Sequence, residues 1–148
     1  GGDDDENASD APKYYPKELV GTWKLVEQTI AFDGIVNTYS DMSEFEEIEI
    51  VPVFRIASDG GLYTYYPIGK DVEESYIGQW YMQNNKLFWN IVEEQDLYEV
   101  PMVSYTSNEL IVSESEYIEG KLAQVTYKFV KTDKEDGIKT ARDYYFGI

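Results

Sequence analysis

The 148-residue chain is the size of one domain, and its 16% aromatic content, which includes 14 tyrosines, favours β-strands over helices. Its 29 acidic and 12 basic residues give a net charge of −17, which disfavours binding to nucleic acids and anionic lipid. Because the chain contains neither cysteine nor histidine, disulfides, thiolate metal sites and Ser-His or Cys-His catalysis are excluded.

The chain opens with an acidic stretch. Residues 1–12 contain five acids, no base and no large apolar side chain. This composition cannot offset the entropy lost on ordering, and its consecutive acids lack the alternating ligands and turn glycine of a calcium loop. We therefore predict a disordered acidic leader over residues 1–15.

Short apolar segments separated by turn residues follow the leader. Residues 16–19 predict one helical turn, which leads into a strand at 20–31. A second strand is predicted at 46–58, where Pro52 indicates a bulge or an edge position. Asp59-Gly60-Gly61 then predicts a hairpin into a third strand at 62–67.

The next hairpin has the clearest register. Asn84-Asn85 predicts a two-residue turn, because asparagine tolerates the positive φ that both positions require. This turn pairs Met82 with Leu87 and Trp80 with Trp89. A slip of one residue would destroy the apolar face that results, which carries Trp80, Met82, Leu87, Trp89 and Ile91.

Two further turns set the register of the last strands. A turn at Ser107-Asn108 pairs Val103 with Val112, and a turn at Glu119-Gly120 pairs Val112 with Tyr127. Both hairpins share one apolar face, made of Val103, Tyr105, Leu110, Val112, Val125, Tyr127 and Phe129.

Eight strands result, each paired with its sequence neighbour, and closure of such a sheet removes its unpaired edges. We therefore predict an all-β fold, an eight-stranded antiparallel up-and-down barrel over residues 16–131. The tail at 132–148 is expected to pack on the barrel exterior, as a short helix with Ile138, Ala141 and Tyr145 on one face or as an extended segment.

Gly21-Thr22-Trp23 follows the helical turn and resembles the G-x-W motif of lipocalins and related calycin barrels. The stretches "LVGTWKLV", "NKLFWNI" and "TSNELIVSESEY" resemble more narrowly the lipocalin-like domains of Bacteroidetes surface lipoproteins, over about residues 17–131. The resemblance implies that Gly21 lets the chain bend at the barrel base and that Trp23 plugs the base beneath a basic side chain. Lys131 is inward by the predicted register and Arg142 lies in the tail, so both are candidates for that side chain, where such families commonly place arginine.

The resemblance also implies a location. Lipoproteins of this kind begin with a lipidated cysteine followed closely by acidic residues, and "GDDDE" would follow such a cysteine, with Gly1 in its place. We therefore expect a protein anchored to the outer membrane by lipid and exposed at the cell surface. The anchor itself is absent from this sequence.

Side chains that share one face of the predicted barrel form the candidate ligand site: Trp80, Trp89, Val103, Tyr105, Glu114, Tyr127 and Phe129. Their large rings predict a narrow, partly open lumen, with room mainly near Gly78 and Val103. Glu114 has two interpretations. It either orients a ligand near the mouth, where it would favour ligands with a donor group over fatty acids, or it is a rim residue where the strand leaves the barrel. Glu27, inward by the parity of Trp23, has the same two interpretations.

We expect the barrel to bind a small apolar or amphipathic ligand without cofactor, metal or enzymatic activity. Tyrosines 63, 65 and 66 either line a pocket or pack in its wall, and residues 93–96 form an exposed loop. The alternative is a protein-interaction module with a filled core, whose contact patch would be Ile77, Tyr81, Phe88 and Val92. A cavity of roughly 300 Å³ or more favours the ligand-binding alternative.

Overall fold

The computed structural model describes residues 11–45 and 50–147, and within them the chain forms ten strands and one α-helix. The strands are β1 (Gly21–Phe32), β2 (Ile35–Tyr39), β3 (Val53–Ile56), β4 (Gly61–Ile68), β5 (Asp71–Gln83), β6 (Lys86–Ile91), β7 (Asp96–Val100), β8 (Met102–Tyr105), β9 (Glu109–Ile118) and β10 (Lys121–Thr132). The helix is α2 (Lys134–Phe146), and two short 3₁₀ turns are η1 (Lys17–Leu19) and η2 (Met42–Glu44).

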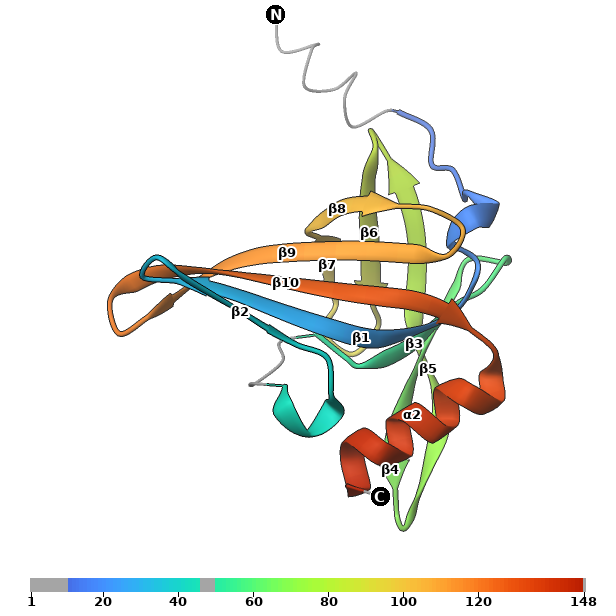
Figure 1. Cartoon of the computed structure of the whole chain (residues 1–148). Helices are drawn as coiled ribbons and strands as arrows, with labels where there is room; N and C mark the ends of the chain where they lie inside the picture. Colours follow the sequence, from blue (N-terminus) through green and yellow to red (C-terminus); the bar gives the residue numbers. More distant parts are fainter. Residues whose placement is uncertain (1–10, 46–49, 148) are drawn as a thin grey trace, which may run out of the picture.

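The strands form an antiparallel, nearly closed barrel. They follow the path β7-β6-β5-β4-β3-β1-β10-β9-β8, with β2 paired to β1 beside this path. The two ends of the path, β7 and β8, are separated by Pro101 alone, so the sheet returns to its starting point. In Figure 1, β5, β6 and β7 cross behind β1, β9 and β10 at a steep angle. The predicted all-β, antiparallel up-and-down barrel is confirmed, with ten strands in the described residues in place of eight.

The registers predicted from turn residues are confirmed at two hairpins. Asn84 (φ 54°) and Asn85 (φ 63°) form the turn between β5 and β6, and Trp80 lies opposite Trp89. Between β9 and β10 the turn at Glu119-Gly120 places Val112 opposite Tyr127. Both turns need left-handed backbone, which asparagine and glycine adopt at low cost.

Two β-bulges change the side on which predicted residues lie. In β1 the register shifts between Leu25 and Glu27, so that Glu27 lies opposite Lys128 and the fully buried Gln28 lies opposite Tyr127. The predicted inward parity of Glu27 is therefore wrong, and Gln28 takes that position. A bulge inserts one extra residue into a strand and so exchanges the two faces beyond it.

The second bulge corrects the predicted position of Val103. Met102, and not Val103, lies opposite Val112, because the register of β8 shifts between Met102 and Ser104. The side chain of Val103 is 64% exposed, so it does not belong to the apolar inner face.

β1 pairs with three strands. The sequence patterns, in contrast, predicted that each strand pairs with its neighbours in the sequence. The first residues of β1 lie against β3, its last residues against β2, and most of its length against β10. The hairpin from β1 into β2 turns at Asp33 (φ 53°) and Gly34 (φ 79°) and was not predicted. The strand predicted at 46–58 is shorter than expected, since β3 begins after Pro52 and residues 46–49 lie outside the described part of the chain.

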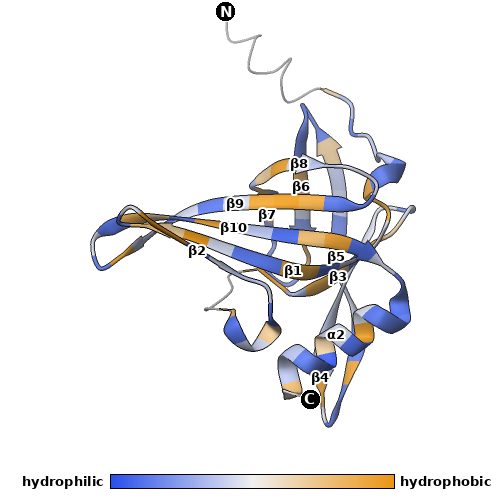
Figure 2. Cartoon of the chain, viewed as in Figure 1, coloured by the Kyte–Doolittle hydropathy of each residue, from blue (hydrophilic) through white to orange (hydrophobic). Residues whose placement is uncertain are grey.

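Large aromatic side chains fill the centre of the barrel. Phe54 packs edge-on against Trp89 and Phe129, with ring centroids 5.0 and 5.1 Å apart. Trp80 is fully buried, and its Nε1 donates to the Ala57 carbonyl at 2.7 Å. Figure 2 shows hydrophobic and hydrophilic segments along the strands that enclose this core. A packed centre excludes a deep, open cup.

The tail forms α2, which packs outside the barrel on β1, β3, β4 and β5. Asp133 caps its first turn by accepting from the Asp136 N–H, and Ile138, Ala141 and Tyr145 face the sheet, as the helical alternative predicted. Arg142 at the outer side of this helix pairs with Asp71 at 2.7 Å.

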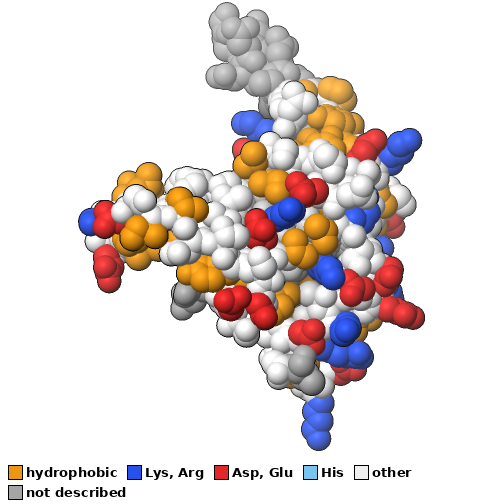
Figure 3. Space-filling model, in the orientation of Figure 1, with side chains coloured by type: hydrophobic (Ala, Val, Ile, Leu, Met, Phe, Trp, Pro, Cys, Tyr) orange, Lys and Arg blue, Asp and Glu red, His pale blue; other side chains and the backbone are white. Residues whose placement is uncertain are grey.

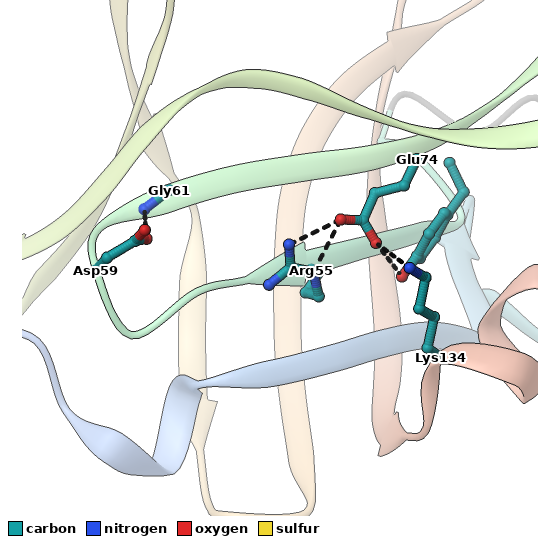
Figure 4. A network of polar contacts seen from close by, with 6 residues as sticks. Arg55, Asp59, Gly61, Glu74 and Lys134 are labelled. Atoms are coloured by element: carbon teal, nitrogen blue, oxygen red, sulfur yellow. Dashed lines mark hydrogen bonds and ion pairs between the residues drawn. The ribbon is translucent and has the colours of Figure 1, made fainter.

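A polar network lies where α2 meets the sheet (Figure 4). Arg55 donates twice to one oxygen of Glu74, at 2.7 and 3.1 Å, and the hydroxyl of the buried Tyr65 donates to the other oxygen at 2.9 Å. Lys134, at the start of α2, lies 4.0 Å from the same carboxylate. Burial opposes ionisation of Glu74, but these partners outweigh burial and lower its pKa.

The segment from Ala11 to Tyr15, predicted as part of the leader, contacts the barrel. Tyr14 and Met82 exchange two backbone hydrogen bonds of 2.9 Å, and the ring of Tyr15 packs edge-on against Trp80 at 5.3 Å. Lys13 lies 4.3 Å from the centre of the Tyr81 ring. The prediction of a disordered leader is therefore wrong for residues 11–15, and residues 1–10 lie outside the described part of the chain.

The far ends of β1, β2, β9 and β10 form an arm that projects from the barrel (Figure 1). Four of its apolar side chains are largely exposed: Ile35, Val36, Tyr117 and Leu122. Hydrophobic side chains are visible on this arm in Figure 3, between charged ones.

Candidate ligand-binding pocket

Trp23 closes one end of the barrel. Its side chain is fully buried, and its Nε1 donates to the Leu19 carbonyl at 2.9 Å. Lys131 lies over the ring, with Nζ 5.1 Å from the ring centre, and donates to the Glu18 carbonyl at 2.6 Å. Lys131, and not Arg142, is thus the basic side chain over Trp23, and burial lowers the pKa of its ammonium group.

Gly21 permits this arrangement. Its φ of +144° is in a region that side chains rarely adopt, and an added Cβ would lie 3.0 Å from Cδ of Lys131. The glycine therefore lets the lysine stem cross the start of β1.

A pocket of about 820 Å³ opens at the other end of the barrel. Its apolar lining comes from Ile50, Val51, Ile77, Ile91 and Val92, and its aromatic lining from Tyr66, Tyr76, Trp89 and Tyr98. Ser75, Glu93, Glu94 and Glu114 supply its polar groups. Trp89 is almost fully buried whereas Val92 is 58% exposed, so the pocket extends from the core to the surface.

The floor of the pocket joins β6, β7 and β9. Trp89 lies opposite Tyr98, with ring centroids 6.2 Å apart, and Glu114 lies opposite Val125 on the barrel's inner face. Burial raises the pKa of Tyr98 to about 12, and the nearby negative charge of Glu114 contributes in the same direction. The Tyr98 phenol is therefore neutral at physiological pH.

Two buried polar atoms have no hydrogen-bond partner among the described residues. They are Nε1 of Trp89, a residue that lines the pocket, and Oγ1 of Thr64 on β4. A buried donor left without an acceptor costs about 1–3 kcal/mol.

The structure brings only two of the seven predicted ligand-binding residues, Trp89 and Glu114, to this pocket. Trp80, Tyr127 and Phe129 are packed inside the barrel, and Tyr105 packs half-buried against that core. Val103 is exposed because of the bulge in β8, and Gly78 lies against the Asn90 backbone, so neither provides the room that was predicted.

Most of the pocket lining was not predicted from sequence. Tyr66 had been considered as a pocket residue, whereas Tyr63 is paired with Tyr76 and Tyr65 faces α2. The contribution of Glu93 and Glu94 to the pocket was not expected, because the composition of an acidic pocket loop is the same as that of an ordinary solvent-exposed turn. The tyrosines at positions 76 and 98, which both line the pocket, were the available signal in the sequence.

Among the described residues, no group of three or more acidic side chains is placed to hold a metal ion. No helix in the same part of the chain is both long and apolar enough to cross a membrane. The arrangement can enclose an organic molecule that has an apolar part.

No protein family model and no curated protein sequence matches the chain. Among solved structures, it is similar to a bovine odorant-binding protein triple mutant (15% identity, 86% of this chain and 87% of that one, TM-score 0.40). It is also similar to apocrustacyanin C1, with 12% identity over 88% of this chain and 71% of that one and a TM-score of 0.44. A third similar structure is the siderocalin Ex-FABP, with 14% identity over 88% of this chain and 87% of that one and a TM-score of 0.32. The antiparallel barrel itself rests on the strand order and registers described above.

Proposed function

We propose that the protein binds a small amphipathic molecule in the pocket at the barrel mouth. The observation that carries this proposal is a pocket of about 820 Å³ whose walls combine five aliphatic and four aromatic side chains with carboxylates. Ligand pockets in proteins are typically about 300–1,000 Å³ and mostly apolar, with a few polar groups that orient the ligand.

The position of the pocket supports binding at the mouth and not in the barrel centre. Trp80, Phe54 and Phe129 occupy the centre, so a ligand's apolar part would rest on Trp89, at the boundary between core and pocket. Such a ligand would keep one end near solvent, which suits a molecule with a polar head.

The rival proposal of a contact patch on the hairpin of β5 and β6 lacks a continuous surface. Ile77 and Val92 line the pocket, whereas Tyr81 is buried beneath Lys13 and stacks on Phe88 at 5.3 Å. The four residues are therefore divided between two environments, and the pocket is the better-supported site.

Titration with N-phenyl-1-naphthylamine, a neutral probe whose fluorescence rises in apolar surroundings, tests the proposal. Val92 and Val103 are similarly exposed valines, but only Val92 lines the pocket. We expect Val92→Trp to fill the pocket and weaken probe binding by about tenfold, whereas Val103→Trp leaves binding unchanged. Equal binding by both variants, or no saturable binding by the wild type, would refute a ligand site at the mouth.

We also propose that the natural protein is a lipid-anchored lipoprotein on the cell surface. The acidic run from Asp3 to Glu6 and the sequence resemblance described above support this proposal. Expression of the natural precursor with a radioactive fatty acid tests it: the mature protein should carry label and should be digested by protease added to intact cells. Unlabelled protein, or protein protected inside intact cells, would contradict the anchor or the exposure, respectively.

A further inference from the structure

The described lining of the pocket carries charge of one sign. Glu93 and Glu94 lie on the loop between β6 and β7, and Glu114 lies on β9, so the carboxylates come from two separate parts of the sheet. Among the described residues that line the pocket there is no lysine or arginine. An anionic head group placed there would meet three negative charges, whereas a cation would be attracted to them.

The aromatic lining has the same preference. The faces of tyrosine and tryptophan rings carry negative potential and attract cations within about 6 Å. Tyr66, Tyr76 and Tyr98 contribute three phenols to the pocket, and Trp89 contributes an indole. Elsewhere in the described chain, cation–π contacts are made by Lys13, Arg55 and Lys131 with rings that do not line the pocket.

Trp89 adds an observation that is independent of charge. Its Nε1 is a buried donor without a partner among the described residues, in a side chain that forms part of the pocket wall. An oxygen acceptor on a bound molecule that reached this nitrogen would satisfy the donor. A metal ion does not account for the acidic lining, because no described group of three acidic side chains is placed to coordinate one.

We propose that the pocket selects amphipathic cations, in which a protonated amine or quaternary ammonium group is joined to an apolar body, over anionic amphiphiles of the same size. The inference rests on the proposed function, since it assigns a ligand class to the same pocket. The ammonium group would lie among Glu93, Glu94, Glu114 and the tyrosines, and the apolar body would pack on Ile91 and Trp89.

Three ligands with the same ten-carbon chain separate charge from hydrophobicity: decyltrimethylammonium, decyl maltoside and decanoate. Each is titrated below its micelle concentration, and its ability to displace N-phenyl-1-naphthylamine is measured. We expect decyltrimethylammonium to bind about tenfold more tightly than decanoate, with the neutral maltoside between them. Equal affinities for the cation and the anion would overturn the inference.

The protein has a net charge of −17, so any cation is attracted to it in general. Matched variants distinguish this general attraction from binding of the cation in the pocket. Glu114→Gln removes one charge from the pocket, and Glu135→Gln removes one from the exposed start of α2. We expect Glu114→Gln to weaken cation binding by about threefold or more and to leave displacement by the maltoside unchanged, whereas Glu135→Gln has little effect on either. An equal effect of the two variants would show that only the overall charge matters.

The two proposals fail in different ways. Absence of saturable binding by the neutral probe would refute the ligand site and the ligand class together. Tight binding of the neutral probe and of decanoate, unaffected by Glu114→Gln, would leave the ligand site and refute its selectivity for cations. Circular dichroism of each variant checks that the fold is retained.

Discussion

Replacement of Gly78 by alanine is the perturbation for which the structure predicts the largest backbone conflict. Gly78 lies in β5 opposite Ile91, with a φ of +155°. A Cβ built on this residue would lie 1.9 Å from the carbonyl oxygen of Asn90, which belongs to the neighbouring strand. Real Cβ contacts essentially never fall below 3.0 Å, so the two strands would have to separate by about 1 Å.

Two costs add at this position. A side chain at such a positive φ costs about 1–3 kcal/mol in backbone strain. Separation of the strands also weakens the adjacent hydrogen bonds, including the 2.9 Å bond from the Val92 N–H to the Ile77 carbonyl, at about 1 kcal/mol each. We therefore expect Gly78→Ala to lower the free energy of unfolding by about 3 kcal/mol or more, a large part of the stability of a typical domain.

Urea denaturation followed by far-ultraviolet circular dichroism measures this change, with Gly21→Ala as the control. Gly21 has a similar φ of +144°, but its added Cβ would meet the flexible stem of Lys131 at 3.0 Å. We expect Gly21→Ala to cost only the strain, about 1–3 kcal/mol, and so less than Gly78→Ala. If Gly78→Ala unfolds within 1 kcal/mol of the wild type, or more gently than Gly21→Ala, the close approach of Gly78 and Asn90 is not a feature of the folded protein.

Trp23→Ala should lower the free energy of unfolding by about 3–5 kcal/mol, because it removes a fully buried indole; a normal melting temperature for this variant would contradict the assignment of Trp23 to the barrel base. Glu74→Gln should cost about 1–3 kcal/mol in urea denaturation, because it weakens the hydrogen bonds from Arg55 and Tyr65, whereas Gln at the exposed neighbour Glu73 should change little. The hydrogen bond from Arg142, and then that from the Val72 N–H, lower the pKa of Asp71 from 3.8 to about 2, so the pair's contribution to stability is present above about pH 4 and is lost as the pH falls toward 2. Carboxyl NMR titration should find that low midpoint, and a midpoint near 3.8 in the wild type would show that the ion pair does not form in solution.

The sequence predicted the hairpins whose register depends on the turn between them. Asn84-Asn85 and Glu119-Gly120 each determine which residues face one another in the strands that they join, so local chemistry was sufficient. Asp33-Gly34 is a turn signal of the same kind, and it could have identified β2.

The bulges explain where the prediction of inward residues failed. Glu27 and Val103 were placed by counting in twos from a known inward residue, and one inserted residue in β1 and in β8 reversed the result. Glu114 was placed correctly on the inner face because the register of β9 and β10 is uninterrupted. These two bulges depend on how the strands fit their neighbours across the sheet, and neither bulged segment contains a proline or glycine that would indicate it.

The pocket required tertiary information. Its walls combine Ile50 and Val51 with Tyr76, Tyr98 and Glu114, which are far apart in the sequence. The angle between strands on opposite sides of the barrel brings these segments together, and hydrophobic periodicity within a single strand does not determine that angle.

The pairing of β1 with β10 has a consequence for how the chain reaches this fold. Lys131 and Glu18, joined by a hydrogen bond at the barrel base, are 113 positions apart, so the barrel cannot close until β10 has been synthesised. Contacts between distant segments slow folding because their loop-closure entropy is lost before they form. During synthesis, β1 can pair with β2 and β3 while its other edge stays open, and the β-rich nascent chain is then vulnerable to association with its own copies. Folding of this protein should therefore be slow for its size, with the joining of its first and last strands as the late step.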